Sequence, residues 1–265
     1  MMELLEALIL GVVQGLTEFL PVSSSGHLEI VKFIMNDDSL AEQSMLTTVF
    51  LHFATALATV VVFRKDILHI IKSVFSSFGN SERSFVIYII LSMIPAAIIG
   101  VFFDDIIETF FHKQIVFVGA MLLVTGILLL VSERIRSQKK EIGTKESIII
   151  GLAQAVAILP GVSRSGATIA TALILGVDKA KAARFSFLMV IPLILGKMSK
   201  DLLSGDFTQN MPSSLYLTIG FAAAFLTGIA ACTWMIKIVK RSRLSYFAYY
   251  CFVVGFLVIA FGSFS

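Results

Sequence analysis

Residues 11–27 read GVVQGLTEFLPVSSSGH, an apolar segment that carries Gln14 and Glu18 and is interrupted by Pro21. Proline ends or kinks a helix, and the Ser/Gly run that follows it favours a loop. A second stretch, residues 151–166, reads GLAQAVAILPGVSRSG and repeats this pattern after 140 positions. The repeat predicts that the two halves of the chain each deliver one broken helix to a shared site.

The two copies share six identical positions, and three other positions differ in ways that change their chemistry. The identical pairs are Gly11 and Gly151, Gln14 and Gln154, Val22 and Val162, Ser23 and Ser163, Ser25 and Ser165, and Gly26 and Gly166. The differing pairs are Glu18 and Ile158, Ser24 and Arg164, and His27 and Ala167. The first copy therefore offers a carboxylate and an imidazole, and the second copy offers a guanidinium.

The composition is that of an integral membrane protein. Hydrophobic residues make up 57% of the chain and charged residues 15%, with a mean hydropathy of +0.92. Soluble domains are nearer half apolar and a quarter charged. We expect a single membrane domain over residues 1–265, surrounded by the bilayer and without nucleic acid as a partner. Cys232 and Cys251 lie in apolar runs and predict neither a disulfide nor a metal motif.

The apolar segments predict both broken and complete membrane helices. Residues 3–34 are interrupted at 21–26, so each half is too short to cross about 30 Å of hydrocarbon. A re-entrant helix–loop–helix fits better, and residues 146–178 repeat it. We predict transmembrane helices over residues 47–63, 84–103, 115–132, 185–203, 214–236 and 245–262. The expected fold is an all-α polytopic membrane protein whose repeats, residues 1–140 and 141–265, each have one re-entrant pair and three transmembrane helices.

The basic residues favour an inverted-topology repeat. Three spans between the two re-entrant pairs would turn the second half upside down relative to the first. One side then collects 16 Lys and Arg residues, in 64–83, 133–145, 179–184 and 237–243, and the other collects Lys32, Lys113, Lys197 and Lys200. Because positive loops stay cytoplasmic, we expect both termini outside. Inverted repeats of this kind place a site where the two breaks meet.

The first motif carries a carboxylate at membrane depth. Gln14 and Glu18 are four residues apart, so we expect them to share one helix face. An ionisable residue within a membrane segment is costly and is by default a functional hypothesis. The alternative is that Glu18 only holds the serine loop through hydrogen bonds.

Both breaks are rich in groups that bind anions. Glycines let backbone N–H groups approach a ligand, and helix N-termini hold anions. Arg164 suits a phosphate through paired, charge-assisted hydrogen bonds, and an ion pair with Glu18 is compatible with this role. The groups expected around the anion are Ser23, Ser24, Ser25, Gly26 and His27 in the first break, and Gly161, Ser163, Arg164, Ser165, Gly166 and Thr168 in the second.

A phosphate beside Glu18 would be repelled unless a cation lies between them. A hard divalent cation shared by carboxylate and phosphate oxygens resolves this repulsion. Ser24 or His27 could attack phosphorus while the other moves the proton, and the residues alone leave this choice open. His52, within the first full span, is interpreted as a packing residue or a contact behind the site. A site reached from within the bilayer suggests a lipid with a phosphorylated head.

At these two motifs the chain resembles the undecaprenyl pyrophosphate phosphatases, the bacitracin-resistance proteins. Gln14 and Glu18 are similar to the family's (E/Q)xxxE motif, and residues 160–165, PGVSRS, are similar to its PGxSRS motif. Many members have Glu at the position of Gln14. The chain therefore has one carboxylate in the first motif where those members have two.

The resemblance implies hydrolysis of undecaprenyl pyrophosphate to undecaprenyl phosphate and inorganic phosphate, which recycles the cell-wall carrier lipid and confers bacitracin resistance. It implies a multi-pass protein of the bacterial inner membrane, an active site facing outside, and dependence on Mg²⁺ or Ca²⁺. It suggests Ser24, His27, Glu18 and Arg164 as catalytic residues, with Glu18 and Gln14 around the metal. A homodimer is left open. The alternative, favoured by an inverted repeat alone, is a transporter or flippase of a phosphorylated polyprenyl lipid.

Overall fold

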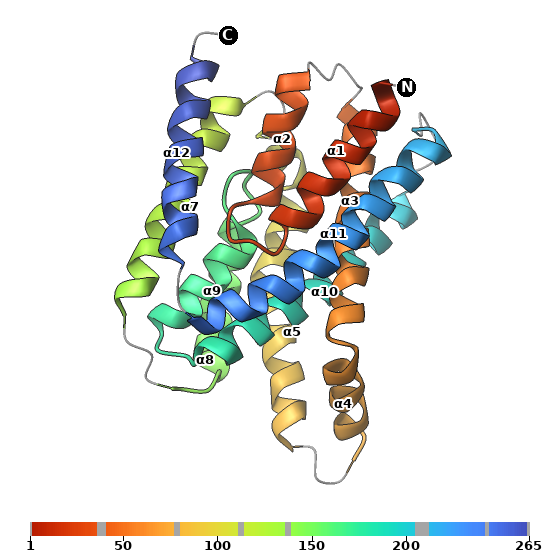
Figure 1. Ribbon diagram of the computed structural model, residues 1–265. Coiled ribbons are helices and arrows are strands. Elements are labelled where there is room, and N and C mark those ends of the chain that lie inside the picture. The colour runs from red at the N-terminus through yellow and green to blue at the C-terminus, as the bar shows by residue number, and fades with distance from the viewer. Residues whose placement is uncertain are drawn as a thin grey trace.

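The computed structural model describes residues 2–35, 41–76, 80–110, 114–135, 139–204, 212–241 and 244–263. Its helices are α1 (Met2–Thr17), α2 (Ser24–Met35), α3 (Ala41–Val62), α4 (Arg64–Val74), α5 (Asn80–Phe102), α6 (Asp104–Thr109), α7 (Ile115–Arg134), α8 (Thr144–Val156), α9 (Arg164–Ile174), α10 (Lys179–Ser204), α11 (Ser214–Arg241) and α12 (Ser245–Gly262). Within these ranges the only strand-like pairing is an isolated bridge between Lys140 and Val177. The all-α prediction is confirmed (Figure 1).

Long apolar helices account for most of the predicted spans. Among the described residues, four helices are long and apolar enough to cross a membrane: Ser81–Phe102, Ile115–Arg134, Ser214–Val239 and Ser245–Gly262. Leu46–Val62 of α3 passes the same test only together with Arg64–Val74, into which it bends by 75°. The other predicted span, 185–203, lies within α10, which contains Pro192. The prediction of a polytopic membrane protein is confirmed, whereas the inverted relation of the halves and their boundary at residue 140 stay predictions.

Two pairs of short helices, α1 with α2 and α8 with α9, break near the middle of the molecule (Figure 1). α1 and α2 lie toward the end that holds both chain termini, and α8 and α9 lie toward the opposite end. The breaks are residues 18–23 and 157–163. The first break begins and ends earlier than the predicted 21–26, because Ser24, Ser25 and Gly26 already form the first turn of α2.

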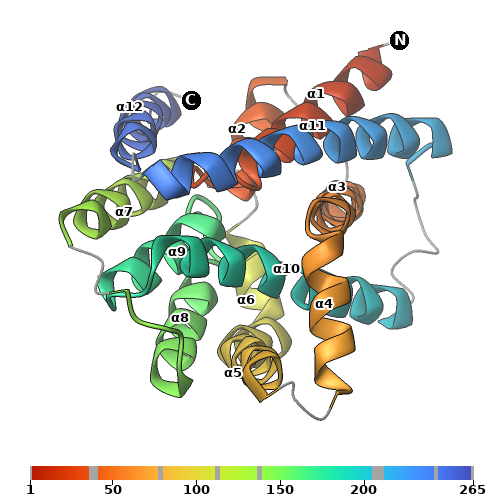
Figure 2. The ribbon, with the colours of Figure 1, turned by 60° about the horizontal axis from the view of Figure 1, so that its bottom comes forward.

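Small residues fix each broken helix against a long one. α11 lies along α1 (Figure 2), and an added Cβ at Gly11 would lie 2.3 Å from the Gly220 carbonyl oxygen. In the second copy, an added Cβ at Gly151 of α8 would lie 2.6 Å from the Ser92 carbonyl oxygen of α5. Glycine at these points lets two backbones approach closely, as small residues do in membrane bundles. The glycine shared by the two motifs therefore sets the position of each broken helix.

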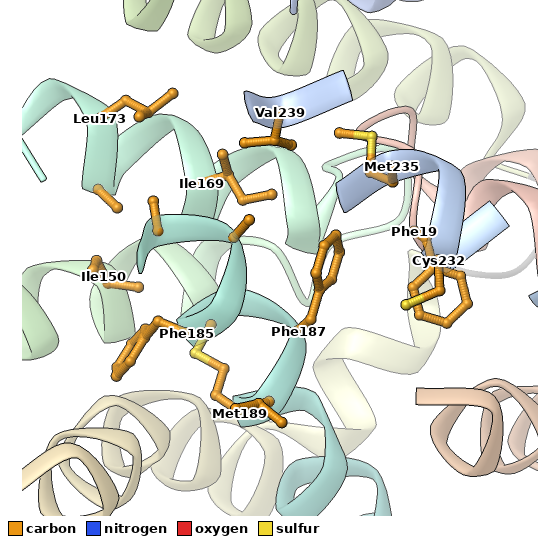
Figure 3. Packing of buried hydrophobic residues seen from close by; sticks show 14 of the residues in the cluster. Phe19, Ile150, Ile169, Leu173, Phe185, Phe187, Met189, Cys232, Met235 and Val239 are labelled. Atoms are coloured by element: carbon orange, nitrogen blue, oxygen red, sulfur yellow. The ribbon is translucent and has the colours of Figure 1, made fainter. Parts of the chain in front are cut away.

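The main hydrophobic core surrounds α10 and reaches the first break. Phe185, Phe187 and Met189 of α10 are almost completely buried (Figure 3). Phe187 packs edge-on against Phe19, with ring centroids 6.0 Å apart. Because Phe19 directly follows Glu18, burial of its ring fixes the backbone of the break beside the carboxylate. Cys232 lies next to Phe19 in the same cluster and is a buried free thiol.

An ion-pair network joins three helices away from the two breaks. Arg184 of α10 donates to both carboxylate oxygens of Asp66 in α4, each at 2.8 Å, and to Glu82 of α5 at 3.0 Å. The guanidinium also lies over the Phe85 ring, 4.3 Å from its centroid. Bidentate contacts of this type fix geometry as well as charge. The network therefore holds α4 at its bend from α3.

Candidate active site

The two breaks, which are far apart in sequence, pack directly against each other. An added Cβ at Gly26 would lie 2.9 Å from Gly161 Cα, so only a hydrogen fits between the first turn of α2 and the second break. Ser165 Oγ donates a hydrogen bond of 3.3 Å to the Leu20 carbonyl oxygen. Gly161 itself has φ +96°, a conformation that glycine adopts without strain. The two motifs therefore form one polar cluster.

Each break ends in the same serine cap. Ser23 Oγ accepts a hydrogen bond from Gly26 N at 3.2 Å, and Ser163 Oγ accepts one from Gly166 N at 3.0 Å. In each copy the capping hydroxyl also lies 3.3 Å from that of the serine two residues later. Such caps stabilise a helix by about 0.5–2 kcal/mol. The serines and glycines shared by the repeat therefore build the helix starts from which Ser24 and Arg164 project.

The backbone of the two caps differs. Ser23 has φ +70°, whereas Ser163 has φ −73°. A left-handed conformation in a residue other than glycine costs on the order of 1–3 kcal/mol and clusters at functional sites. The Ser23 carbonyl oxygen accepts two hydrogen bonds from His27, one from the backbone N at 3.1 Å and one from Nδ1 at 2.8 Å. The strained residue is therefore the one that holds the imidazole.

Glu18 is the centre of the cluster and is 6% exposed. Its Oε1 accepts a hydrogen bond from Arg164 Nη2 at 2.6 Å. Its Oε2 accepts one from Ser24 Oγ at 2.7 Å and one from Gln14 Nε2 at 3.1 Å. The Glu18 backbone N–H donates to the Gln14 carbonyl oxygen at 2.9 Å, so helical geometry continues past the end of α1. Gln14 and Glu18, expected to share one helix face, also contact each other through their side chains.

Arg164 opens α9 and reaches across to the first break. Its Nη1 donates to the Ser186 carbonyl oxygen of α10 at 3.0 Å, while Nη2 binds Glu18. The Thr168 hydroxyl donates to the Arg164 carbonyl oxygen at 2.8 Å and lies 2.7 Å from Ser186 Oγ. The ion pair with Glu18 that the sequence allowed is thus formed. The guanidinium is held at two points and faces the carboxylate that also binds Ser24.

His27 contacts a residue outside both motifs. Its Nε2 lies 2.8 Å from the Tyr250 hydroxyl oxygen of α12, and the two rings are stacked. The structure therefore pairs Ser24 with Glu18 and pairs His27 with Tyr250. Sequence reasoning considered Ser24 and His27 as a nucleophile and its proton carrier. In the structure the group that accepts the serine hydroxyl hydrogen is a carboxylate.

Two further residues contact the cluster: His52, which the sequence allowed as a contact behind the site, and Tyr250, which sequence reasoning missed. His52 Nε2 lies 3.5 Å from Glu18 Oε2, and His52 Nδ1 donates to the Thr48 carbonyl oxygen at 2.8 Å. In the sequence, His52 lies within an apolar span, and an ionisable residue in such a span indicates a contact with the site more than simple packing. Tyr250 gave no such signal, because a tyrosine near the start of a span is also what an interfacial aromatic belt predicts.

The repeated glutamines have unequal surroundings. Gln154 is 1% exposed, and among the described residues neither its Oε1 nor its Nε2 has a hydrogen-bond partner. Gln14 Nε2 binds Glu18 and lies 3.4 Å from Thr55 Oγ1, while its Oε1 has no partner in the described part of the chain. A buried amide left unpaired costs about 1–3 kcal/mol. Because Ile158 replaces the carboxylate in the second copy, the ionic cluster forms around Gln14.

The donors near Glu18 fit a limited cation site. Within the residues that the structure describes, no three His, Cys, Asp or Glu side chains gather into a metal-binding group. Mg²⁺ is commonly held by one or two protein oxygens together with water and substrate phosphates. The unpartnered Gln14 Oε1 and the neighbouring Glu18 carboxylate supply oxygens of that type. These two side chains fit a cation site in which most of the ligands come from water or a bound anion.

The profile of a family described as bacitracin resistance protein BacA matches residues 7–257. The chain belongs to this family. A relative from Christiangramia forsetii, named undecaprenyl-diphosphatase, is 54% identical over 260 residues, which cover 98% of each chain. Relatives with the same name from Bacteroides fragilis and Methanobrevibacter smithii are 49% and 38% identical, and each match covers 97% of this chain. The matches also cover 98% and 97% of the lengths of these two relatives, so the similarity extends over nearly the whole of each protein.

The BacA membership confirms the resemblance that the two motifs indicated. In this BacA chain the first motif contributes Gln14 and Glu18, and the second contributes Arg164. The hydrogen bond of 2.6 Å from Arg164 Nη2 to Glu18 Oε1 joins the two motifs in one site.

Proposed function

We propose that this chain is an undecaprenyl-diphosphatase, an integral membrane enzyme that hydrolyses undecaprenyl diphosphate to undecaprenyl phosphate and inorganic phosphate. The observation that carries the proposal is the cluster in which Glu18 binds Ser24 at 2.7 Å and Arg164 at 2.6 Å. A hydroxyl, a base for its proton and a cationic fork beside both are groups that phosphoryl transfer uses. The shared name of the relatives supports the choice of substrate.

Ser24 is the proposed nucleophile. Its Oγ attacks the terminal phosphorus, the phosphorus–oxygen bond to the lipid phosphate breaks, and the hydroxyl proton passes to Glu18. Water then attacks the phosphoserine, and Glu18 returns its proton to Ser24 while phosphate leaves with both hydrogens of the water. The short contact between Ser24 Oγ and Glu18 Oε2 supports this assignment, because a base must lie within hydrogen-bond reach of the proton it takes.

Arg164 and His27 are the proposed contacts of the substrate phosphates. Guanidinium presents several N–H donors in a planar fork, which can bind phosphate oxygens beside its contacts to Glu18 and Ser186. His27 lies three residues after Ser24 on α2, so both side chains share one helix face. We assign His27 to proton exchange with the bound phosphates. The substrate contacts predicted for the other serines, glycines and Thr168 of the two breaks stay predictions.

A divalent cation, Mg²⁺ or Ca²⁺, completes the proposed site. When bound it would neutralise charge on the diphosphate, and Gln14 and Glu18 would be its protein ligands. Within this arrangement Gln14 also orients Glu18 through its Nε2 hydrogen bond. Loss of the carboxylate should therefore lower the affinity of the site for the cation and also remove the base that accepts the Ser24 proton.

Glu18→Gln tests the two roles of the carboxylate together. We expect its residual turnover to require about tenfold more Mg²⁺ for half-maximal rate, because a carboxylate ligand has been removed. The measurement is phosphate release against Mg²⁺ concentration. Glu146→Gln, which changes a carboxylate that caps α8 at the Gly143 N–H, serves as the matched control and should titrate as the parent does. An unchanged titration in Glu18→Gln would place the cation elsewhere.

The proposed setting is the bacterial inner membrane, with the site open to the outer face and the product returned to cell-wall synthesis. Removal of the diphosphate form would confer bacitracin resistance. The basic residues on one predicted side of the membrane support this orientation.

The orientation predicts opposite accessibility of two positions. Single cysteines introduced by Ser263→Cys and Lys140→Cys, in a variant with Cys232 and Cys251 replaced by alanine, should react with an impermeant thiol reagent from outside and inside respectively. Because the chain has only these two cysteines, each labelled variant carries one thiol, the introduced one. Labelling of both positions from the same side would contradict the arrangement.

A further inference from the structure

Tyr250 brings a side chain of the last helix onto a motif residue that lies 223 positions earlier. Its hydroxyl oxygen is 2.8 Å from His27 Nε2. The two rings are also stacked, with centroids 5.5 Å apart and 12° between their planes. One tyrosine therefore hydrogen-bonds the imidazole and lies nearly parallel to it.

The hydrogen-bond partners of His27 determine its tautomer. A carbonyl oxygen only accepts hydrogen bonds, so the contact of Nδ1 with the Ser23 carbonyl at 2.8 Å places a proton on Nδ1. In the neutral ring Nε2 then carries the lone pair and accepts the hydrogen of the Tyr250 hydroxyl. A half-turn of the ring would replace both nitrogens by carbons and lose both bonds. The two partners together thus allow one orientation of the imidazole.

Tyr250 is much more exposed than the imidazole that it contacts. His27 is 8% exposed, whereas Tyr250 is 44% exposed. The hydroxyl of a partly exposed tyrosine thus binds the basic nitrogen of a buried histidine. On the same helix, the thiol of Cys251 lies 3.8 Å from the Pro21 carbonyl oxygen, so two successive residues of α12 contact the first break and the start of α2.

We propose that Tyr250 is a positioning residue for His27. It holds the imidazole in the Nδ1–H tautomer and orders the ring before substrate binds. When substrate enters, the Tyr250 hydroxyl releases Nε2, and a phosphate oxygen takes its place as the partner with which Nε2 exchanges a proton. Preorganisation of this kind raises the rate without adding a contact to substrate. The inference rests on the proposed diphosphatase activity. Tyr250 lies outside both sequence motifs.

Tyr250→Phe tests the inference, because it keeps the stacked ring and removes the hydroxyl. We expect kcat for a long-chain prenyl diphosphate to fall about three- to tenfold with KM nearly unchanged, as for loss of one hydrogen bond. Tyr249→Phe changes the neighbouring tyrosine, which is 59% exposed, and should leave kcat as in the parent. Thermal unfolding in detergent checks that both variants fold.

A spectroscopic measurement separates positioning from a general structural effect. The imidazole ¹⁵N signals of His27, assigned by comparison with His27→Gln, should show a protonated Nδ1 in the parent and a shifted Nε2 signal in Tyr250→Phe. Parental ¹⁵N signals in Tyr250→Phe, or an unchanged kcat, would overturn the inference. Absence of turnover in the parent would overturn the proposed function itself, whereas turnover in the parent that Tyr250→Phe leaves intact would overturn the positioning role alone.

Discussion

Arg164→Ala is expected to lower the turnover of undecaprenyl diphosphate by at least about 1,000-fold, the order of magnitude that a phosphate-binding arginine contributes to phosphoryl transfer. The guanidinium faces the nucleophile and its base, because Nη2 lies 2.6 Å from Glu18 Oε1 and Ser24 lies 2.7 Å from the other carboxylate oxygen. Its removal takes away both the phosphate contact and the counter-charge for developing negative charge. The measurement is phosphate release at saturating substrate.

Arg164→Lys is the matched variant for this prediction. Lysine keeps the positive charge beside Glu18 but has no planar fork, so it should preserve the ion pair and the fold better than alanine. We expect Arg164→Lys to unfold near the parental temperature and still to turn over far more slowly than the parent. Parental turnover by a well-folded Arg164→Ala sample would remove this residue from the mechanism.

Ser24→Ala is expected to lower turnover by a similar factor, at least about 1,000-fold, because loss of a nucleophile leaves only binding and charge stabilisation. The serine lies in the first turn of α2, where the strained Ser23 and its cap direct it toward Glu18. Substrate should still bind, so the apparent affinity for a non-hydrolysable diphosphate analogue should stay within about threefold of the parent.

Ser132→Ala is the control for the serine prediction. Ser132 is a buried hydroxyl that donates to the Leu129 carbonyl oxygen within α7, so its loss removes a comparable hydrogen bond away from the cluster. Turnover by this variant should match the parent. Substantial phosphate release by Ser24→Ala would assign the attack on phosphorus to another group, and His27 would be the next residue to change.

The ionic cluster could be predicted from sequence because its members lie in two copies of one pattern. Glu18 and Arg164 stand out as charged residues at membrane depth, and the repeat brings their breaks together. The structure confirms their contact directly. The repeat also marked Gly11 and Gly151, and in the structure both glycines allow close packing against a neighbouring helix.

Other features depend on tertiary structure that local patterns do not encode. Tyr250 reaches His27 only because α12 packs beside the first break, and its sequence context is that of an ordinary interfacial tyrosine. The start of α2 at Ser24 depends on the left-handed Ser23, which propensity rules disfavour. The 75° bend between α3 and α4 follows no proline or glycine, and the Arg184 network that holds it involves residues from three helices.

The central claim is tested most directly by phosphate release from a long-chain prenyl diphosphate, using the detergent-purified full chain with and without a chelator. Arg164→Ala is measured beside the parent. We predict release that requires a divalent cation and that disappears in the variant. No release from well-folded parent with any divalent cation would contradict the enzyme assignment, and movement of the lipid between the leaflets of liposomes would then support the transporter alternative.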